Sequence, residues 1–228
     1  MMMNTGGTPA ISKNKLLTTI AWQLNGKTTY ALEGSVFMGG AVIQWLRDEL
    51  GMLNNAAESE KLALSVADNG GVYLVPAMAG LGAPHWDQSA RGSIFGLTRG
   101  SSKAHIARAA LESIVYQVGD LVAAQVSDTG IKLTEMRVDG GAVANNFLMQ
   151  FQADMLGAKV IRPKILETTA LGAAYLAGLA VGYWSDIDEL KALWSVEREF
   201  VNQMEDAIRE DNTRYWHKAV ERAKGWSA

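Results

Sequence analysis

RVDGGAVANNFLMQFQADML (137–156) is the most informative stretch of the sequence. The residues before the two glycines are typical of a strand, and NNFLMQFQADML has the apolar spacing of a helix. A strand that runs through Gly-Gly into a helix presents backbone N–H groups and the positive end of the helix dipole to a ligand. Glycine also lets a ligand lie against the backbone. The stretch predicts a ligand-binding turn, with Asn145 or Asn146 supplying a side-chain amide.

The competing interpretation is a tight turn whose glycines serve backbone geometry alone. Asp139, just before the glycines, fits either a turn cap or a water-mediated metal contact, and we expect the cap. The sequence has no Walker lysine and no G-x-G-x-x-G pattern, so a P-loop and a Rossmann fingerprint are both excluded.

The tetrapeptide Gly-Gly-Ala-Val also occurs in VFMGGAVIQW (36–45). The flanking residues of the two copies do not match, so we reject an internal repeat. Close packing is the simplest interpretation of Gly39 and Gly40 here. Gln44 lies one helical turn after Gly40 and is expected on the same side.

Strand and helix patterns alternate along the rest of the sequence, which indicates a mixed α/β sheet flanked by helices. Asn25-Gly26 is a strong hairpin signal, and Ser101-Ser102 offers an N-cap for a long helix. Stretch 170–184 is apolar but too short to span a bilayer, so we expect a buried helix. The last helix should place Ile208, Tyr215, Ala219 and Ala223 on one apolar side. The expected strands are 16–24, 27–34, 71–77, 92–97, 135–141 and 159–163. The expected helices are 37–50, a long helix that starts after Ser101-Ser102, 145–156, 167–182 and 205–226, with some helix around AAESEKLALSV.

The composition is that of an ordinary globular protein: 228 residues, 48% hydrophobic, with a formal net charge of −3. A mildly acidic, mixed surface argues against binding along a nucleic-acid backbone. There is no cysteine, which excludes disulfides and cysteine-based metal sites and fits a cytoplasmic protein. The N-terminus lacks a signal-peptide core. The first apolar segment follows Met1 so closely that we expect the chain to begin inside a larger protein.

The loop GLGAPHWDQSARG (80–92) contains His85, Asp87 and Arg91, a possible acid–base set. The three histidines are widely separated, so a histidine-rich metal site or a Ser-His-Asp triad has little support. Packing or solvent exposure is the more frequent role of a histidine next to tryptophan. The residue spacing alone therefore predicts a pocket the size of a nucleotide and no particular reaction.

GSIFGLTRGSSKAHIARAALE (92–112) resembles the second signature of the FGGY carbohydrate kinases, including His105 and Glu112. Within that family, TYALEGSVFMGGAVIQWLRD, VDGGAVANNFLMQFQADMLG and ETTALGAAYLAGLAVGYW resemble the glycerol kinases. The resemblance implies an actin/Hsp70/ribonuclease H-like ATPase domain over residues 1–200, with a C-terminal helical extension over 201–228.

The activity that the resemblance implies is transfer of a phosphoryl group from Mg·ATP to glycerol by a homo-oligomeric enzyme. Gly40 and Gln44 then correspond to nucleotide contacts from one wall of a pocket, and Gly141 and Asn145 to contacts from the other. The family's catalytic aspartate, glycerol-binding residues and first phosphate loop precede the position of Met1. The resemblance therefore implies no catalytic residue and no metal ligand in this chain, which we expect to be inactive alone.

Two alternatives remain at this point. The chain resembles another sugar kinase of the family, such as a xylulokinase, less well because of ETTALGAAYLAGLAVG. A non-catalytic interaction or oligomerisation module would instead bind nucleotide weakly or not at all, and would expose an apolar face.

Overall fold

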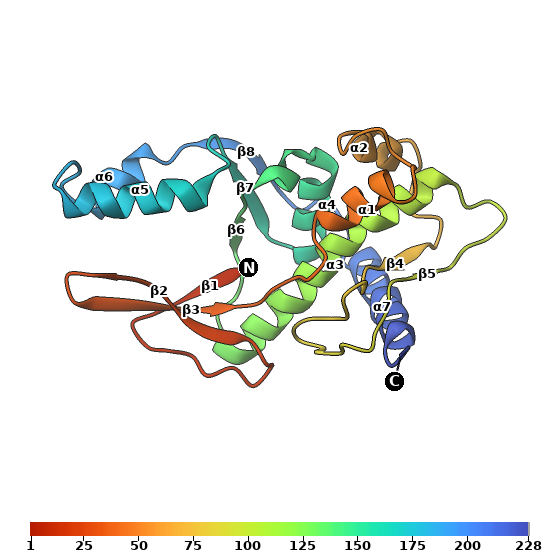
Figure 1. Ribbon diagram of the computed structural model, residues 1–228, viewed down its shortest axis with the longest axis horizontal. Coiled ribbons are helices and arrows are strands. Elements are labelled where there is room, and N and C mark those ends of the chain that lie inside the picture. The colour runs from red at the N-terminus through yellow and green to blue at the C-terminus, as the bar shows by residue number, and fades with distance from the viewer. Residues whose placement is uncertain (228) are drawn as a thin grey trace. The chain divides into compact units, whose positions relative to one another are not determined.

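The computed structural model describes residues 1–227, which form eight β-strands and seven α-helices (Figure 1). The chain divides into two compact units: residues Met1–Leu133 together with the chain from Met204 onward, and residues Thr134–Gln203. The first unit contains β1 (Met2–Gly6), β2 (Leu17–Leu24), β3 (Lys27–Glu33), α1 (Ala41–Asp48), α2 (Glu58–Leu64), β4 (Tyr73–Val75), β5 (Ser93–Phe95), α3 (Lys103–Thr129) and α7 (Asp206–Ala223). The second contains β6 (Glu135–Arg137), the 3₁₀ turn η1 (Gly141–Ala144), α4 (Asn146–Leu156), β7 (Lys159–Pro163), α5 (Thr168–Ala180), α6 (Ile187–Leu193) and β8 (Val196–Phe200).

The hairpin predicted around Asn25-Gly26 is confirmed. β2 and β3 pair antiparallel, with Leu24 opposite Lys27, and β1 pairs antiparallel with the other edge of β3. Asn25 and Gly26 have φ values of +49° and +74°, the left-handed conformations that a two-residue hairpin turn requires. β1 itself was not predicted, because its sequence MMNTG has no alternating pattern.

The long helix α3 organises the first unit, packing against α1, α2 and β4. Its predicted start is confirmed: Ser102 is the N-cap, in a reciprocal capping box with the His105 side chain. Leu121 and Ala124 on α3 meet Leu16 and Leu32 from the hairpin region in one apolar cluster. The buried Gln125 adds a hydrogen bond from Nε2 to the Leu32 carbonyl oxygen over 3.1 Å.

A stack of aromatic rings joins β4, α3 and α7. Tyr73 stacks on Tyr116 at 5.9 Å between ring centroids, and Tyr116 stacks on Trp216 at 5.3 Å. The predicted apolar side of α7 is partly wrong: Ala219 and Ala223 are buried, but Ile208 and Tyr215 are exposed. Trp216 is the large buried residue of this helix instead, because its indole N–H has a polar partner inside the unit.

The second unit is built on a mixed sheet in the order β6-β7-β8, parallel between β6 and β7 and antiparallel between β7 and β8. The helix α4 packs on β7 and β8. Leu148, Phe151, Val160 and Phe200 supply buried apolar side chains. The predicted succession of strand, Gly-Gly, helix and strand is thus confirmed, whereas α6 and β8 were missed within a charged segment.

The buried helix predicted over 170–184 is wrong. The helix forms as α5, but Gly178 is its only buried residue within the described chain. Leu176 is 47% exposed, and Val181 and Tyr183, just beyond the helix, are 81% and 75% exposed. The sequence shows that this helix is apolar, but it does not show whether another surface of the chain packs against the helix. The predicted boundary between residues 200 and 201 stays a prediction.

Candidate functional site

The second Gly-Gly forms a well-anchored turn between β6 and α4. The Gly140 N–H donates a hydrogen bond to the Leu166 carbonyl oxygen over 2.9 Å. Asp139 accepts a hydrogen bond from the Thr168 hydroxyl at the start of α5, so its carboxylate ties the turn to that helix. No group of metal-ligating side chains occurs in residues 1–227, so a metal role for Asp139 finds no support.

The two glycines of this turn differ in what the chain itself requires. Gly140 has a φ of +82°, a conformation that side chains strongly disfavour. Gly141 lies outside that region, is exposed, and would meet no atom within 4 Å if it carried a Cβ. Backbone geometry therefore explains Gly140, whereas neither backbone conformation nor packing requires a glycine at position 141.

Asn145 and Asn146 have separate tasks. Asn145 is the N-cap of α4: its Oδ1 accepts a hydrogen bond from the Leu148 N–H over 2.9 Å. Its Nδ2 has no hydrogen-bond partner among residues 1–227 and is available to an external acceptor. Asn146 Oδ1 instead accepts from Arg162 at 3.0 Å and from Arg198 at 3.2 Å.

The first Gly-Gly lies in the other unit, at the start of α1. Gly40 has a helical φ of −53° and is exposed, and its carbonyl oxygen accepts from the N–H groups of Ile43 and Gln44. Gln44 is exposed on the first turn of α1, and its side chain has no partner within the described chain. Both residues are thus accessible on their own unit, as Gly141 and Asn145 are on theirs.

The three candidate acid–base residues of loop 80–92 do not converge. The Asp87 carboxylate accepts hydrogen bonds from Ser89, Ala90 and Gly225, and those from Ser89 and Gly225 are the main reason that its pKa falls to about 2. Arg91 donates to two nearby backbone carbonyl groups. An acid–base role for this set is therefore not supported by the geometry.

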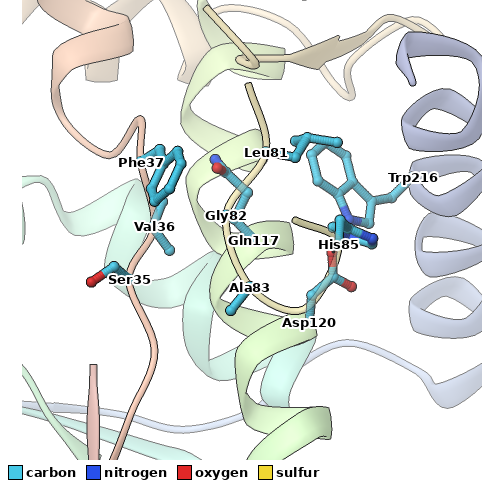
Figure 2. Close-up of a pocket in the computed structure, with 10 residues that line it drawn as sticks. All are labelled: Ser35, Val36, Phe37, Leu81, Gly82, Ala83, His85, Gln117, Asp120 and Trp216. Carbon is cyan, nitrogen blue, oxygen red and sulfur yellow. Dashed lines mark hydrogen bonds and ion pairs between the residues drawn. The ribbon is translucent and has the colours of Figure 1, made fainter. Parts of the chain in front are cut away.

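The third member, His85, belongs to a cluster around Asp120 of α3 (Figure 2). Asp120 accepts hydrogen bonds from Trp216 Nε1 at 2.8 Å and shares close contacts with His85 Nε2 at 3.2 Å and His217 Nε2 at 2.9 Å. Burial acts to raise the pKa of Asp120, but hydrogen bonds from His217, His85 and Trp216 outweigh burial and lower it. The adjoining pocket has a volume of about 10 Å³, room for one water molecule and not for a nucleotide. The cluster joins loop 80–92, α3 and α7.

A second buried network surrounds Glu112. Its carboxylate accepts hydrogen bonds from Arg108 Nε and Asn69 Nδ2, each at 2.8 Å. Burial raises the pKa of Glu112. Arg108 also donates to the carbonyl oxygens of Val66 and Ala67, which fastens the segment before β4 to α3. The signature residues His105 and Glu112 thus have structural roles in this chain.

Sequence reasoning missed Asp120 and Arg162 as organising residues. A signal was present for both, since each is a charged residue next to an apolar run, Leu121-Val122 for Asp120 and Val160-Ile161 for Arg162, and buried charges need partners.

Residues 1–181 match the FGGY family of carbohydrate kinases, C-terminal domain. The chain belongs to this family of kinases. It is 60% identical over 227 residues to glycerol kinases of Parabacteroides distasonis and Paraburkholderia phytofirmans, covering all of this chain and 46% of each relative. The chain therefore spans less than half the length of the curated relatives it matches.

Solved structures agree. A Plasmodium falciparum glycerol kinase with ADP superposes with a TM-score of 0.91 at 38% identity, covering 97% of this chain and 44% of that chain. A Lactobacillus acidophilus gluconate kinase, at 24% identity and a TM-score of 0.80, covers the same shares and shows the fold alone. The predicted actin/Hsp70/ribonuclease H-like fold is confirmed. None of the helices in residues 1–227 has the length and apolarity needed to cross a membrane.

Proposed function

We propose that this chain is the nucleotide-binding, C-terminal part of a kinase that transfers the γ-phosphoryl group of ATP to glycerol, giving sn-glycerol 3-phosphate and ADP. The observation that carries the proposal is the turn at residues 140–146. There Gly141 is a glycine that the chain itself does not need, and the Asn145 amide donor has no partner in the described chain. Support comes from the 60% identity to glycerol kinases and from the similar fold of a glycerol kinase with ADP.

The nucleotide contacts in this proposal are Gly40 and Gln44 on the first unit and Gly141 and Asn145 on the second. Catalysis of phosphoryl transfer rests on positioning and charge stabilisation, so such contacts bear directly on rate. The general base and the glycerol-binding residues would come from the N-terminal part of the longer protein, and no catalytic residue is assigned to this chain. The proposal includes a cytoplasmic location and a homo-oligomeric full-length enzyme.

Mg²⁺ accompanies the nucleotide in the proposed reaction. The residues of this chain do not fit a metal centre of their own, because residues 1–227 contain no group of three His, Cys, Asp or Glu side chains that could hold an ion. Mg²⁺ characteristically binds to phosphates and one or two carboxylates, and we assign it no step here.

Titration calorimetry with ADP tests the contacts. Gly141→Val places a side chain in open space, so the fold should tolerate it while ADP affinity falls at least about tenfold, the effect of 1.4 kcal/mol. Asn145→Asp keeps the oxygen that caps α4 but replaces the free amide with an anionic oxygen, so it should also weaken ADP binding without destabilising the helix. Unchanged ADP affinity in both variants would refute the assigned contacts.

A phosphotransfer assay tests whether this chain needs the N-terminal part of the longer protein for activity. The chain alone should show no transfer from ATP to glycerol, and addition of the N-terminal part of the Parabacteroides distasonis enzyme should restore it. Clear activity of the chain alone would contradict the proposal. The alternatives named from the sequence are not favoured, since gluconate and xylulose kinase structures at 24% identity or less show the fold only.

A further inference from the structure

Arg162 is the buried charge of the second unit. It lies on β7 with 8% of its surface exposed, in a strand otherwise made of apolar residues at its centre. Its guanidinium nevertheless has partners on three segments: Nη1 donates to the Val143 carbonyl oxygen at 2.7 Å, Nη2 to Asn146 Oδ1 at 3.0 Å, and Nε to Glu197 Oε2 at 2.6 Å. The first two partners lie on η1 and at the first residue of α4.

The surroundings of position 162 explain why the residue there is an arginine. A buried charge is costly unless it is paired and hydrogen-bonded, and Glu197 on β8 supplies the opposite charge. The hydrogen bond from Arg162 lowers the pKa of Glu197, so the carboxylate stays ionised. The planar guanidinium can donate in three directions at once from fixed positions, whereas a lysine ammonium carries its donors on one flexible tip.

Residues 139 and 140 anchor the start of the turn, through Thr168 and Leu166, and the 3₁₀ turn η1 that follows has short-range backbone hydrogen bonds. The Val143 N–H donates back to Gly140 over 3.3 Å and the Asn145 N–H to Ala142 over 3.2 Å, both within the turn. Arg162 of β7 ties the second half of the turn to the sheet, through its bond to the Val143 carbonyl group. Two residues further on, the backbone sets the position of Asn145, whose amide is the proposed ligand donor.

We propose that Arg162 is a positioning residue for nucleotide binding: held by Glu197, it fixes Val143 and Asn146 so that Gly141 and the Asn145 amide are presented in one geometry. The inference rests on the proposed function, because it names what holds those contacts in place. Nothing in it requires Arg162 to touch the nucleotide.

The chain offers a matched control. Arg198 donates to the same Asn146 Oδ1 at 3.2 Å and lies over the same Phe200 ring, but it is exposed and has no bond to Val143. Arg162→Lys and Glu197→Gln should each lower ADP affinity measured by calorimetry, and Arg198→Met should leave it within about twofold. We expect at least a tenfold loss of ADP affinity for Arg162→Lys, equivalent to about 1.4 kcal/mol, because a lysine cannot hold Val143, Asn146 and Glu197 at once.

Amide hydrogen exchange of residues 140–146 in the ligand-free chain tests the positioning role of Arg162 separately from nucleotide binding. Faster exchange in Arg162→Lys but not in Arg198→Met supports the positioning role even if the wild-type chain binds no ADP, an outcome that would refute the proposed function alone. All measurements are made well below the unfolding temperature of every variant, where a residue that only stabilises the fold leaves ADP affinity unchanged. Wild-type exchange and wild-type ADP affinity in folded Arg162→Lys would overturn the inference. If that variant does not fold, the same result in Glu197→Gln overturns it.

Discussion

Asp120 and His217 lie 97 positions apart in the sequence, yet 2.9 Å separates Asp120 Oδ1 from His217 Nε2. The pair fastens α7 to α3, beside the stacked rings of Tyr116 and Trp216. Because one partner is an imidazole and the other a largely buried carboxylate, the attachment of the last helix should depend on pH.

The first prediction is the direction of that dependence. The hydrogen bond that His217 donates to Asp120 raises the pKa of His217 above its ordinary value. Burial and Lys224 oppose the rise, and the charge of Glu221 adds to it. The pair's contribution is therefore complete below about pH 6.5, the unfolded value, and is lost as pH rises through the folded-state pKa. Asp120 has a lowered pKa, so its contribution is lost only as pH falls below about 4.

Urea unfolding between about pH 6 and 8 should show stability falling by no more than about 1 kcal/mol, because His217 is half exposed. His217→Gln should remove that decline. The same slope in the variant and the wild type would mean that another group is responsible.

The second prediction concerns the buried pair of Arg108 and Glu112. Arg108→Met removes the cation and leaves a carboxylate that is 3% exposed with only neutral hydrogen-bond partners. Loss of one partner from a buried ion pair costs about 3–5 kcal/mol, which urea unfolding would measure. The double variant Arg108→Met/Glu112→Gln should recover much of the loss, since no charge then remains buried. Equal stability of the single and double variants would contradict this account.

A third prediction compares two glycines in the first unit. Gly96 has a φ of +80°, and a Cβ there would lie 1.9 Å from the Gly71 carbonyl oxygen. Gly96→Ala should destabilise the chain by about 3 kcal/mol or more, because strain and a backbone clash combine. Gly119 lies inside α3 with open space around it, so Gly119→Ala should stabilise by about 1 kcal/mol. Thermal unfolding of both variants should shift in opposite directions.

Local signals predicted much of the fold. Asn25-Gly26 determines its own turn conformation, Ser102 caps α3, and the strand-turn-helix at Gly140 is read directly from adjacent residues. The failures depend on residues far apart in sequence. Trp216 is buried because Asp120, from another helix, accepts its indole N–H, and no pattern within α7 contains that information.

The residues of the candidate site also fall into those that a local motif predicts and those that depend on distant contacts. Gly141 and Asn145 were found from the sequence because a ligand-binding turn is a local motif. Arg162 was not, because its role appears only when β7 lies beneath the turn and β8 brings Glu197 to it. Along β8 itself, VEREF alternates charge with few apolar residues, so its strand character comes from pairing with β7.

The fourth prediction follows from the exposed apolar surface of α5. A helix that is apolar on all sides is normally buried, but here Leu176 on α5 is exposed, as are Val181 and Tyr183 just after its last residue. Such a patch favours association, because covering it removes apolar area from water at about 25 cal/mol per Å². The purified chain should therefore self-associate in sedimentation velocity experiments.

Leu176→Lys combined with Val181→Lys should weaken that association about tenfold or more, equivalent to about 1.4 kcal/mol, because each lysine places a charge in the contact. Thr169→Lys, at an exposed polar position of the same helix, is the matched control and should change it little. A wild-type chain that stays monomeric up to high concentration would contradict the prediction. Equal weakening by Thr169→Lys would show that net charge, rather than this surface, governs the association.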